Sequence, residues 1–267
     1  MNTFSRKRKI LGLKATAITG EGLLDRIDVA ILRRQRITIA SLNLHGIYVN
    51  FTDPAFRALH QDDQTLVRVD GMSVIMLARL SRARLHREHR IAWIDLLPRL
   101  MAKAATAPWR VFYLGGDPDV LEVGLSKIRT LYPTVAVDGS HGFFSMTTGG
   151  IANERTLARI NAWRPDILLV GMGMGRQERW ILENRARLEV PVVAVCGACI
   201  EYFAGSVKAA PRWLGPLGVE WAYRLISDPS RFAWRYLVEP WLAMALLARA
   251  NLSALARRLR LARATEP

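Results

Sequence analysis

The feature that most constrains this chain is an alternation of short apolar runs, several ending in glycine, with longer helical stretches. Apolar runs of about four to eight residues separated by amphipathic segments are typical of βαβ units and a parallel sheet. Predicted strands cover residues 37–44, 66–69, 110–114, 134–137, 166–170 and 190–196, and predicted helices cover 53–61, 117–131, 153–163 and 177–188. The pattern predicts an α/β fold with a Rossmann-like parallel sheet flanked by helices.

Charge and composition divide the 267 residues into three expected parts. Residues 1–36 mix charges with few strand signals and are predicted to be a basic N-terminal lead-in. Residues 37–210 carry the strand and helix alternation and are predicted to be the α/β domain. Residues 211–267 bring tryptophans, arginines and helically spaced leucines together, which predicts a basic amphipathic helical appendage.

The net charge of +15, from 38 Lys and Arg against 23 Asp and Glu, indicates a polyanionic partner. Nucleic acid, an anionic membrane surface and phosphorylated substrates all fit, and a soluble protein from an arginine-rich proteome is the plain alternative. The basic residues 6–9 are followed by no apolar core, so a signal peptide is disfavoured. No run approaches the roughly 18 apolar residues of a spanning helix. We therefore expect a cytoplasmic protein, peripheral on the inner face of the membrane.

Two glycine loops follow predicted strands. Gly115 and Gly116 end one strand, and Gly171, Gly173 and Gly175 follow another. Such loops let backbone N–H groups approach a phosphate, and the carboxyl ends of parallel strands converge on one crevice. Tight structural turns are the alternative. The second loop is not the GxGxxG dinucleotide motif, and no acidic ribose ligand follows it, which disfavours an oxidoreductase.

Asp70 follows a predicted strand and precedes a glycine, where its carboxylate could serve as a general base or simply form an Asp-Gly turn. Asp117 and Asp119 could hold a divalent metal, but capping of the following helix is favoured. Cys196 and Cys199 could form a redox pair, but small residues at a crowded strand end are favoured. We expect no metal and no cofactor.

The arginines of the last segment, Arg224, Arg231 and Arg235 among them, lie between tryptophans. A guanidinium binds phosphate oxygens with two parallel hydrogen bonds, and tryptophan is suited to a lipid headgroup interface. An ordinary packing helix with solvated arginines is the alternative.

The order of these motifs resembles the WecG/TagA/CpsF glycosyltransferase family over residues 39–236. The segments that carry the resemblance are Ser41-Leu42-Asn43, Asp70-Gly71-Met72, Leu114-Gly115-Gly116-Asp117-Pro118, Val170-Gly171-Met172-Gly173, Gln177-Glu178, Ala204-Gly205, Ala210-Pro211 and Gly218-Val219-Glu220-Trp221-Ala222-Tyr223-Arg224, followed by Pro229, Arg231, Arg235 and Tyr236. Each segment alone is unspecific, whereas the ordered series is specific.

The resemblance implies an inverting, metal-independent transfer of a hexose from a UDP-sugar to a polyprenyl-diphosphate-linked saccharide, in cell-surface or exopolysaccharide biosynthesis. The hexose in such enzymes is N-acetylmannosamine, its uronic acid or glucose. The resemblance makes Asp70 the catalytic base, with Ser41 and Asn43 beside it. It assigns donor binding to Gly115, Gly116, Gly171, Gly173, Arg176, Gln177, Glu178 and Glu201, and the acceptor diphosphate and membrane to Arg224, Arg231 and Arg235.

This chain departs from the family pattern at three places. Gly175-Arg176 stands where Pro-Lys is usual, Ile200-Glu201 where Phe-Asp is usual, and Ser41 replaces Thr. These positions lie near the expected donor pocket and bear on the sugar more than on the reaction. From its place at the glycine loop, Arg176 is expected to stabilise the departing diphosphate.

A non-catalytic protein that binds nucleic acid or an anionic surface is the alternative class, because the net charge allows it. No helix-turn-helix or RRM signature is present, and the basic residues are not gathered into one motif with stacking aromatics. We therefore expect no nucleic-acid partner. The apolar tail suggests that copies of the chain associate into a homo-oligomer.

Overall fold

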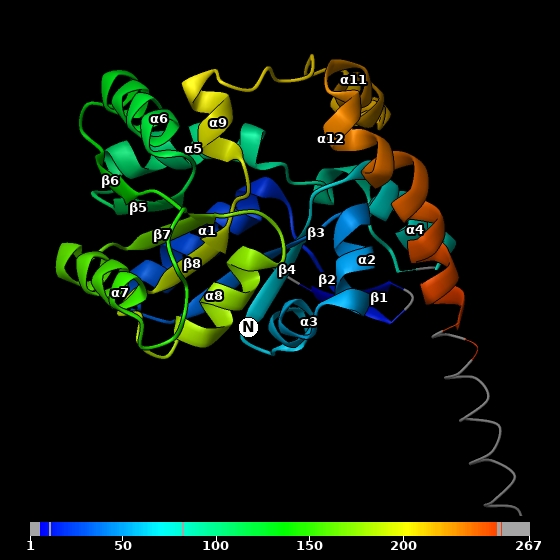
Figure 1. The fold of residues 1–267 in the computed structure, drawn as a ribbon, viewed down its shortest axis with the longest axis horizontal. Helices are drawn as coiled ribbons and strands as arrows, with labels where there is room; N and C mark the ends of the chain where they lie inside the picture. The colour runs from blue at the N-terminus through cyan, green and yellow to red at the C-terminus, as the bar shows by residue number, and fades with distance from the viewer. Residues whose placement is uncertain (1–5, 11, 82, 250–251, 253–267) are drawn as a thin grey trace, which may run out of the picture.

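The computed structural model describes residues 6–10, 12–81, 83–249 and 252. A six-stranded parallel sheet in the order β4-β3-β8-β7-β5-β6 forms its centre (Figure 1). Its strands are β3 (Ile37–Leu42), β4 (Thr65–Val69), β5 (Arg110–Gly115), β6 (Ala136–Ser140), β7 (Ile167–Gly171) and β8 (Val192–Val195). The predicted α/β fold with a Rossmann-like parallel sheet is confirmed.

Helices cover both faces of this sheet because successive strand residues point to opposite sides. On β3, Ile37 and Ile39 pack into the core under one layer, while Ala40 and Leu42 pack under the other. The first layer holds α1 (Gly20–Leu32), α5 (Trp93–Thr106), α6 (Pro118–Leu131) and α9 (Cys199–Ala204). The second holds α2 (Leu44–Thr52), α3 (Pro54–Gln61), α4 (Met72–Leu80), α7 (Ile151–Trp163) and α8 (Arg176–Asn184).

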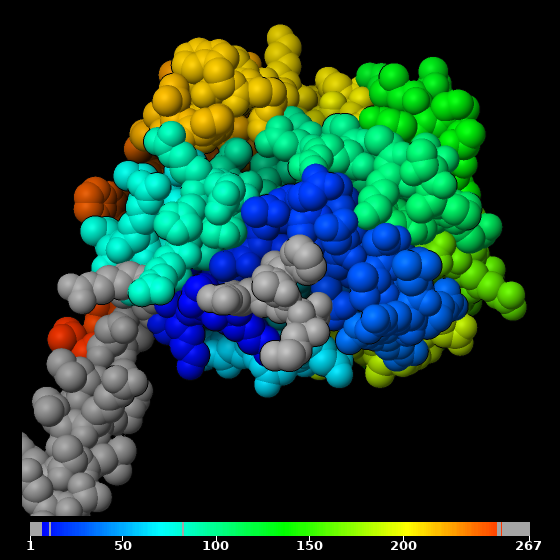
Figure 2. Space-filling model, turned by 180° about the vertical axis from the view of Figure 1, so that it is seen from behind, coloured from blue at the N-terminus to red at the C-terminus, as the bar shows by residue number. Residues whose placement is uncertain are grey.

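The N-terminal part differs from the lead-in expected over residues 1–36. It contains an antiparallel hairpin of β1 (Arg6–Ile10) and β2 (Leu13–Ala17), followed by α1. The hairpin lies beside β4, where the backbone N–H of Val67 donates to Thr16 Oγ1 (3.2 Å). Figure 2 shows these residues, in blue, in the middle of the rear surface. The many charges of this N-terminal part hide the strand pattern. Four of its apolar residues are nevertheless fully buried: Ile10, Ile18, Leu23 and Ile27.

The C-terminal part is helical, as predicted, over the residues that the structure describes. It contains α10 (Leu214–Leu217), α11 (Glu220–Ser227), α12 (Pro229–Ala233) and a π-turn, η2 (Trp234–Val238), after which the helix continues over residues 239–249. The buried Ala243 and Leu247 fasten this last helix to the core cluster of α2 and α4. Within the described residues, no helix is both long and apolar enough to cross a membrane. The expectation for 253–267 lies outside those residues.

Candidate active site

Two cavities meet at the carboxyl ends of the parallel strands. The strand-end cavity, of about 210 Å³, is lined by Ser41, Asn43, Arg68, Asp70, Gly173, Gln177, Glu201, Arg224, Arg231 and Arg235, among others. The apolar cavity, of about 390 Å³, lies between α4 and the C-terminal helices and is lined by residues that include Leu44, Met72, Met76, Trp221 and Tyr236. Asn43, Asp70, Arg224 and Arg235 line both cavities, so Asp70 lies at their junction.

Strand ends and helix starts fix the polar residues at this junction. Asp70 follows β4 directly, and its backbone N–H donates to the Leu42 carbonyl oxygen (2.9 Å). Asn43 follows β3 and caps α2, because its Oδ1 accepts a hydrogen bond from the backbone N–H of Gly46 (2.8 Å). Ser41 is buried near the end of β3. The three residues predicted as catalytic are therefore brought together by neighbouring strands β3 and β4.

The strand-end cavity has an excess of positive charge and unsatisfied polar atoms. Four arginines line it against the two carboxylates of Asp70 and Glu201. Among the described residues, three of its lining side chains have a buried polar atom without a hydrogen-bond partner: Arg68 Nε, Gln177 Oε1 and Arg235 Nε. Burial, followed by the nearby Arg224, lowers the pKa of Arg235. Because buried polar groups are normally paired, this cavity is suited to an anionic, hydrogen-bonding ligand.

Several of the predicted donor-binding glycines are closely packed at the strand ends. Gly115, Gly116 and Gly171 are not among the residues that line the two cavities. A Cβ on Gly115 would overlap the backbone of Gly171, and a Cβ on Gly171 would overlap the Tyr113 hydroxyl and the Gly197 carbonyl oxygen. Gly173 differs, since it lines the strand-end cavity and has open space around its Cα. Among the four predicted donor-binding glycines, only Gly173 therefore leaves room for a ligand against its backbone.

Arg176 and Glu178, also predicted to bind the donor, are both held by hydrogen bonds within the protein, Arg176 at the surface and Glu178 in the interior. Arg176 Nη2 donates to the carbonyl oxygens of Gly142 (2.9 Å) and Phe144 (2.7 Å), which holds the loop after β6. Glu178 is fully buried and accepts hydrogen bonds from the Gly175 backbone N–H (2.6 Å) and from Gln177 Nε2 (2.9 Å). Burial raises the pKa of Glu178 to about 7. Glu178 thus orients Gln177 and the glycine loop without lining a cavity itself.

Glu178 should make the stability of the fold depend on pH. The pKa of this carboxyl group is about 7 in the folded chain and 4.5 in the unfolded chain, so the folded chain binds its proton more tightly. The resulting stabilisation is complete below pH 4.5 and is lost as pH rises to about 7. In Glu178→Gln this loss is absent. The free energy of unfolding is measured with urea at about pH 5 and about pH 8. Between these two pH values the wild type should lose about 2 to 3 kcal/mol more than the variant. Parallel pH dependences of the two proteins would contradict the assignment.

Asp117 and the two cysteines lie in surroundings that fit the favoured structural roles, a helix cap and small residues at a crowded strand end. Asp117 caps α6, since its Oδ1 accepts a hydrogen bond from the backbone N–H of Asp119 (3.2 Å). Cys196 and Cys199 are free, buried thiols, the first directly after β8 and the second at the start of α9. Among the described residues, no three His, Cys, Asp or Glu side chains form a group that could hold a metal ion.

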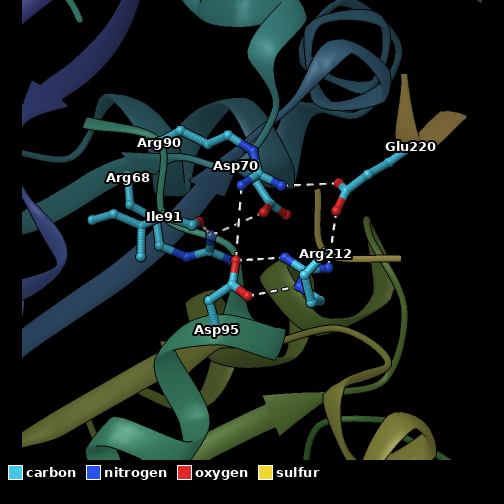
Figure 3. A network of polar contacts seen from close by, with 7 residues as sticks. All are labelled: Arg68, Asp70, Arg90, Ile91, Asp95, Arg212 and Glu220. Carbon is cyan, nitrogen blue, oxygen red and sulfur yellow. Dashed lines mark hydrogen bonds and ion pairs between the residues drawn. The ribbon is translucent and has the colours of Figure 1, made fainter. Parts of the chain in front are cut away.

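A ring of ion pairs joins the C-terminal helices to the α/β domain (Figure 3). Arg90 Nη2 contacts Glu220 Oε2 (2.9 Å), and Arg212 Nη1 contacts Glu220 Oε1 (2.9 Å). Arg212 Nε donates to Asp95 Oδ1 (2.9 Å), and Arg90 Nη1 closes the ring at 3.8 Å from Asp95 Oδ2. The motif series contains Glu220, but its ion pairs with Arg90 and Arg212 were not predicted, because Arg90 and Glu220 are 130 residues apart in the sequence. Their ring holds α11, and with it Arg224, over the site.

An α/β fold with a carboxylate at the junction of two cavities, one of them rich in arginine, fits a glycosyltransferase, and the comparison with known families shows that class. The chain belongs to the glycosyl transferase WecG/TagA/CpsF family, whose model matches residues 8–257. It is 34% identical over 213 residues to the N-acetylglucosaminyldiphosphoundecaprenol N-acetyl-beta-D-mannosaminyltransferase of Bacillus subtilis (strain 168), covering 76% of this chain and 79% of that protein. The protein of the same name from Staphylococcus aureus (strain MW2) is 31% identical over 227 residues, covering 84% of this chain and 86% of the relative. The resemblance found in the motif order is thereby confirmed.

Proposed function

We propose that this enzyme transfers a hexose from a UDP-sugar to a polyprenyl-diphosphate-linked saccharide, with inversion and without a metal ion. The names of the relatives favour N-acetylmannosamine as the sugar and diphosphoundecaprenol-linked N-acetylglucosamine as the acceptor. The observation that carries the proposal is the position of Asp70 where the strand-end cavity and the apolar cavity meet. A base that serves a transfer between two substrates belongs at such a junction.

The UDP-sugar is assigned to the strand-end cavity. Gly173, Gln177 and Glu201 line it, and all three are donor-binding residues in the family resemblance. The acceptor is assigned to the apolar cavity, whose Met72, Met76 and Trp221 suit the isoprenoid carbons next to the acceptor diphosphate. The acceptor hydroxyl would lose its proton to Asp70 and attack the anomeric carbon from the face opposite UDP.

Arginines supply the positive charge that the reaction needs. The departing UDP carries new negative charge on its diphosphate, and fixed cations stabilise such charge without a metal ion. Arg224 and Arg235 line both cavities, so their guanidinium groups are available to the donor and acceptor diphosphates, while Arg231 lines only the strand-end cavity. Arg176 is assigned to the loop at Gly142 and Phe144 rather than to the diphosphate.

The test is UDP release by the purified protein, with a panel of UDP-sugars and a short-chain polyprenyl-diphosphate N-acetylglucosamine, in EDTA and in Mg²⁺. Acceptor-dependent release that persists in EDTA is the expected result, and the panel identifies the donor. Release that requires Mg²⁺ would overturn metal independence. Protein that shows no UDP-dependent shift of its unfolding temperature would overturn the donor assignment, since a bound ligand stabilises the folded state.

The exposed tryptophans of the C-terminal helix are proposed to bind the anionic inner surface of the membrane. Trp234 is 59% exposed and Trp241 is 76% exposed on the described helix, which also carries arginines. The double change Trp234→Ser and Trp241→Ser should weaken sedimentation with anionic lipid vesicles by about tenfold or more, because apolar area is lost from the interface. Leu131→Ser, which removes from α6 an apolar side chain that is 64% exposed, is the control on another surface. Equal loss of binding in both variants would contradict the assignment.

A further inference from the structure

Arg68 is a fully buried arginine in β4, only 1% exposed, directly below the proposed base. Charged side chains are almost never buried so completely unless they are paired. Its guanidinium is held on several sides. Nη1 donates to the Ile91 carbonyl oxygen and lies 3.4 Å from Asp70 Oδ1. Figure 3 shows the three residues together. The guanidinium carbon lies 5.3 Å from the centre of the Trp93 ring.

This arrangement is built into the sheet. Arg68 and Asp70 are two residues apart at the end of β4, so their side chains leave the strand on the same face. The loop that carries the Ile91 carbonyl is itself tied to the strand, since the backbone N–H of Ile91 donates to the Val69 carbonyl oxygen (2.8 Å). Trp93 is anchored in turn, because its Nε1 donates to the Val195 carbonyl oxygen of β8. Arg68 therefore has little freedom to move away from Asp70.

The other groups that face Asp70 come from different elements. Arg224 of α11, Arg235 of η2 and Tyr202 of α9 are close enough to interact electrostatically with its carboxylate. Arg224 and Arg235 belong to the C-terminal helices and line both cavities, where substrate diphosphates are proposed to bind. Arg68 alone among these cations belongs to the sheet and lines only the strand-end cavity. Its pairing with Asp70 does not compete with an acceptor diphosphate.

We propose that Arg68 is a positioning residue that fixes the carboxylate of Asp70 for proton abstraction. The ion pair holds Oδ1 on the side of the sheet, which leaves Oδ2 for the acceptor hydroxyl at the junction of the cavities. This inference rests on the proposed role of Asp70 as the base. Arg68 acts through Asp70 and needs no contact with either substrate.

Arg68→Gln should lower kcat by about 10- to 100-fold, because a carboxylate displaced by about an ångström no longer abstracts the proton efficiently. The KM for the UDP-sugar should stay near its wild-type value. Arg68→Lys keeps the charge but lacks the rigid, planar guanidinium whose Nη1 contacts both Ile91 and Asp70, so its kcat should lie between those of the wild type and Arg68→Gln.

The decisive experiment combines Arg68→Gln with Asp70→Asn in a double-mutant cycle on kcat. If Arg68 acts through Asp70, the double variant should be no slower than Asp70→Asn alone. Additive losses, or a higher KM for the UDP-sugar in place of a lower kcat, would overturn the positioning role and assign Arg68 to donor binding or to the fold. Asp70→Asn with wild-type kcat would overturn the proposed base and this inference with it, which is a different result from additivity.

Folding is controlled separately. The midpoint of thermal unfolding and its shift with UDP are measured for each variant, and Arg68→Lys provides the conservative change if Arg68→Gln does not fold. Arg57→Gln is the matched control, since the Arg57 guanidinium also bonds backbone carbonyl oxygens, those of Asn50 and Phe51, but lines neither cavity. Arg57→Gln should lower the stability of the fold, and its effect on kcat should be independent of the effect of Asp70→Asn. A cycle for Arg57→Gln that is as non-additive as that for Arg68→Gln would contradict a specific role for Arg68.

Discussion

Asp70→Asn is expected to lower kcat by about 10² to 10⁴-fold, the usual contribution of a general base. The amide has nearly the size of the carboxylate and can keep a hydrogen bond with Arg68, so the two cavities keep their shape. What disappears is the group that accepts the proton of the acceptor hydroxyl. Because Asp70 lies at the junction and not within the donor loop, binding of the UDP-sugar should be preserved.

The measurement is steady-state UDP release with saturating donor and acceptor, together with the UDP-induced shift in unfolding temperature. A low kcat with an unchanged shift is the expected pair of results. Loss of the shift together with kcat would mean that Asp70 supports donor binding instead. A variant that releases UDP at nearly the wild-type rate would remove Asp70 from the mechanism.

Gly171→Ala is expected to destabilise the fold by about 3 kcal/mol, the upper part of the range for overpacking. Its new Cβ would overlap the Tyr113 hydroxyl and the Gly197 carbonyl oxygen. These two groups already share a hydrogen bond of 2.9 Å, and Tyr113 is fully buried, so neither can move aside easily. The strain would also displace Gly197, which lines the strand-end cavity, and activity should fall with stability.

Gly173→Ala separates this packing effect from an effect on the ligand. Its Cβ would meet nothing within 4 Å, but its φ of +86° favours glycine and should cost about 1 to 2 kcal/mol. Urea unfolding should therefore show that Gly171→Ala is the less stable variant. For a given loss of stability, the affinity for UDP should fall more in Gly173→Ala than in Gly171→Ala. The reverse ranking in unfolding would contradict the packing role of Gly171.

The alternation of apolar runs was sufficient to predict the parallel sheet because buried parallel strands leave a strong local signal. It also placed Asp70 after a strand, whereas Ser41 and Asn43, inside the predicted strand 37–44, were named from the family resemblance alone. The N-terminal hairpin was not predicted, since its charged residues outnumber the few apolar ones that reach the core. Arg68 was missed for a related reason: an arginine in a strand gives no sign that it is buried until its partners Ile91 and Trp93 are placed around it.

The glycine loops show a limit of motif reasoning. A strand can end in glycine because a bound phosphate approaches its backbone closely or because a neighbouring backbone does. The sequence is the same in both cases. For Gly115 and Gly171 the neighbouring backbone and the Tyr113 side chain supply the requirement. Only the three-dimensional neighbours of each Cα distinguish them from Gly173.

The π-turn at η2 has a consequence for the alignment of the C-terminal helix. Arg231, Arg235, Glu239, Ala243 and Leu247 are spaced four residues apart, and they lead from the strand-end cavity to the buried anchors of the helix. In a regular α-helix each step of four residues rotates by about 40° beyond a full turn, so a stripe of five would wind around the helix. A π-turn, with its i→i+5 hydrogen bonds, advances less per residue and cancels part of this rotation. The wider turn thus keeps these five residues closer to one side of the helix. One continuous helix can therefore be anchored at one end and present its guanidinium groups to the active site at the other.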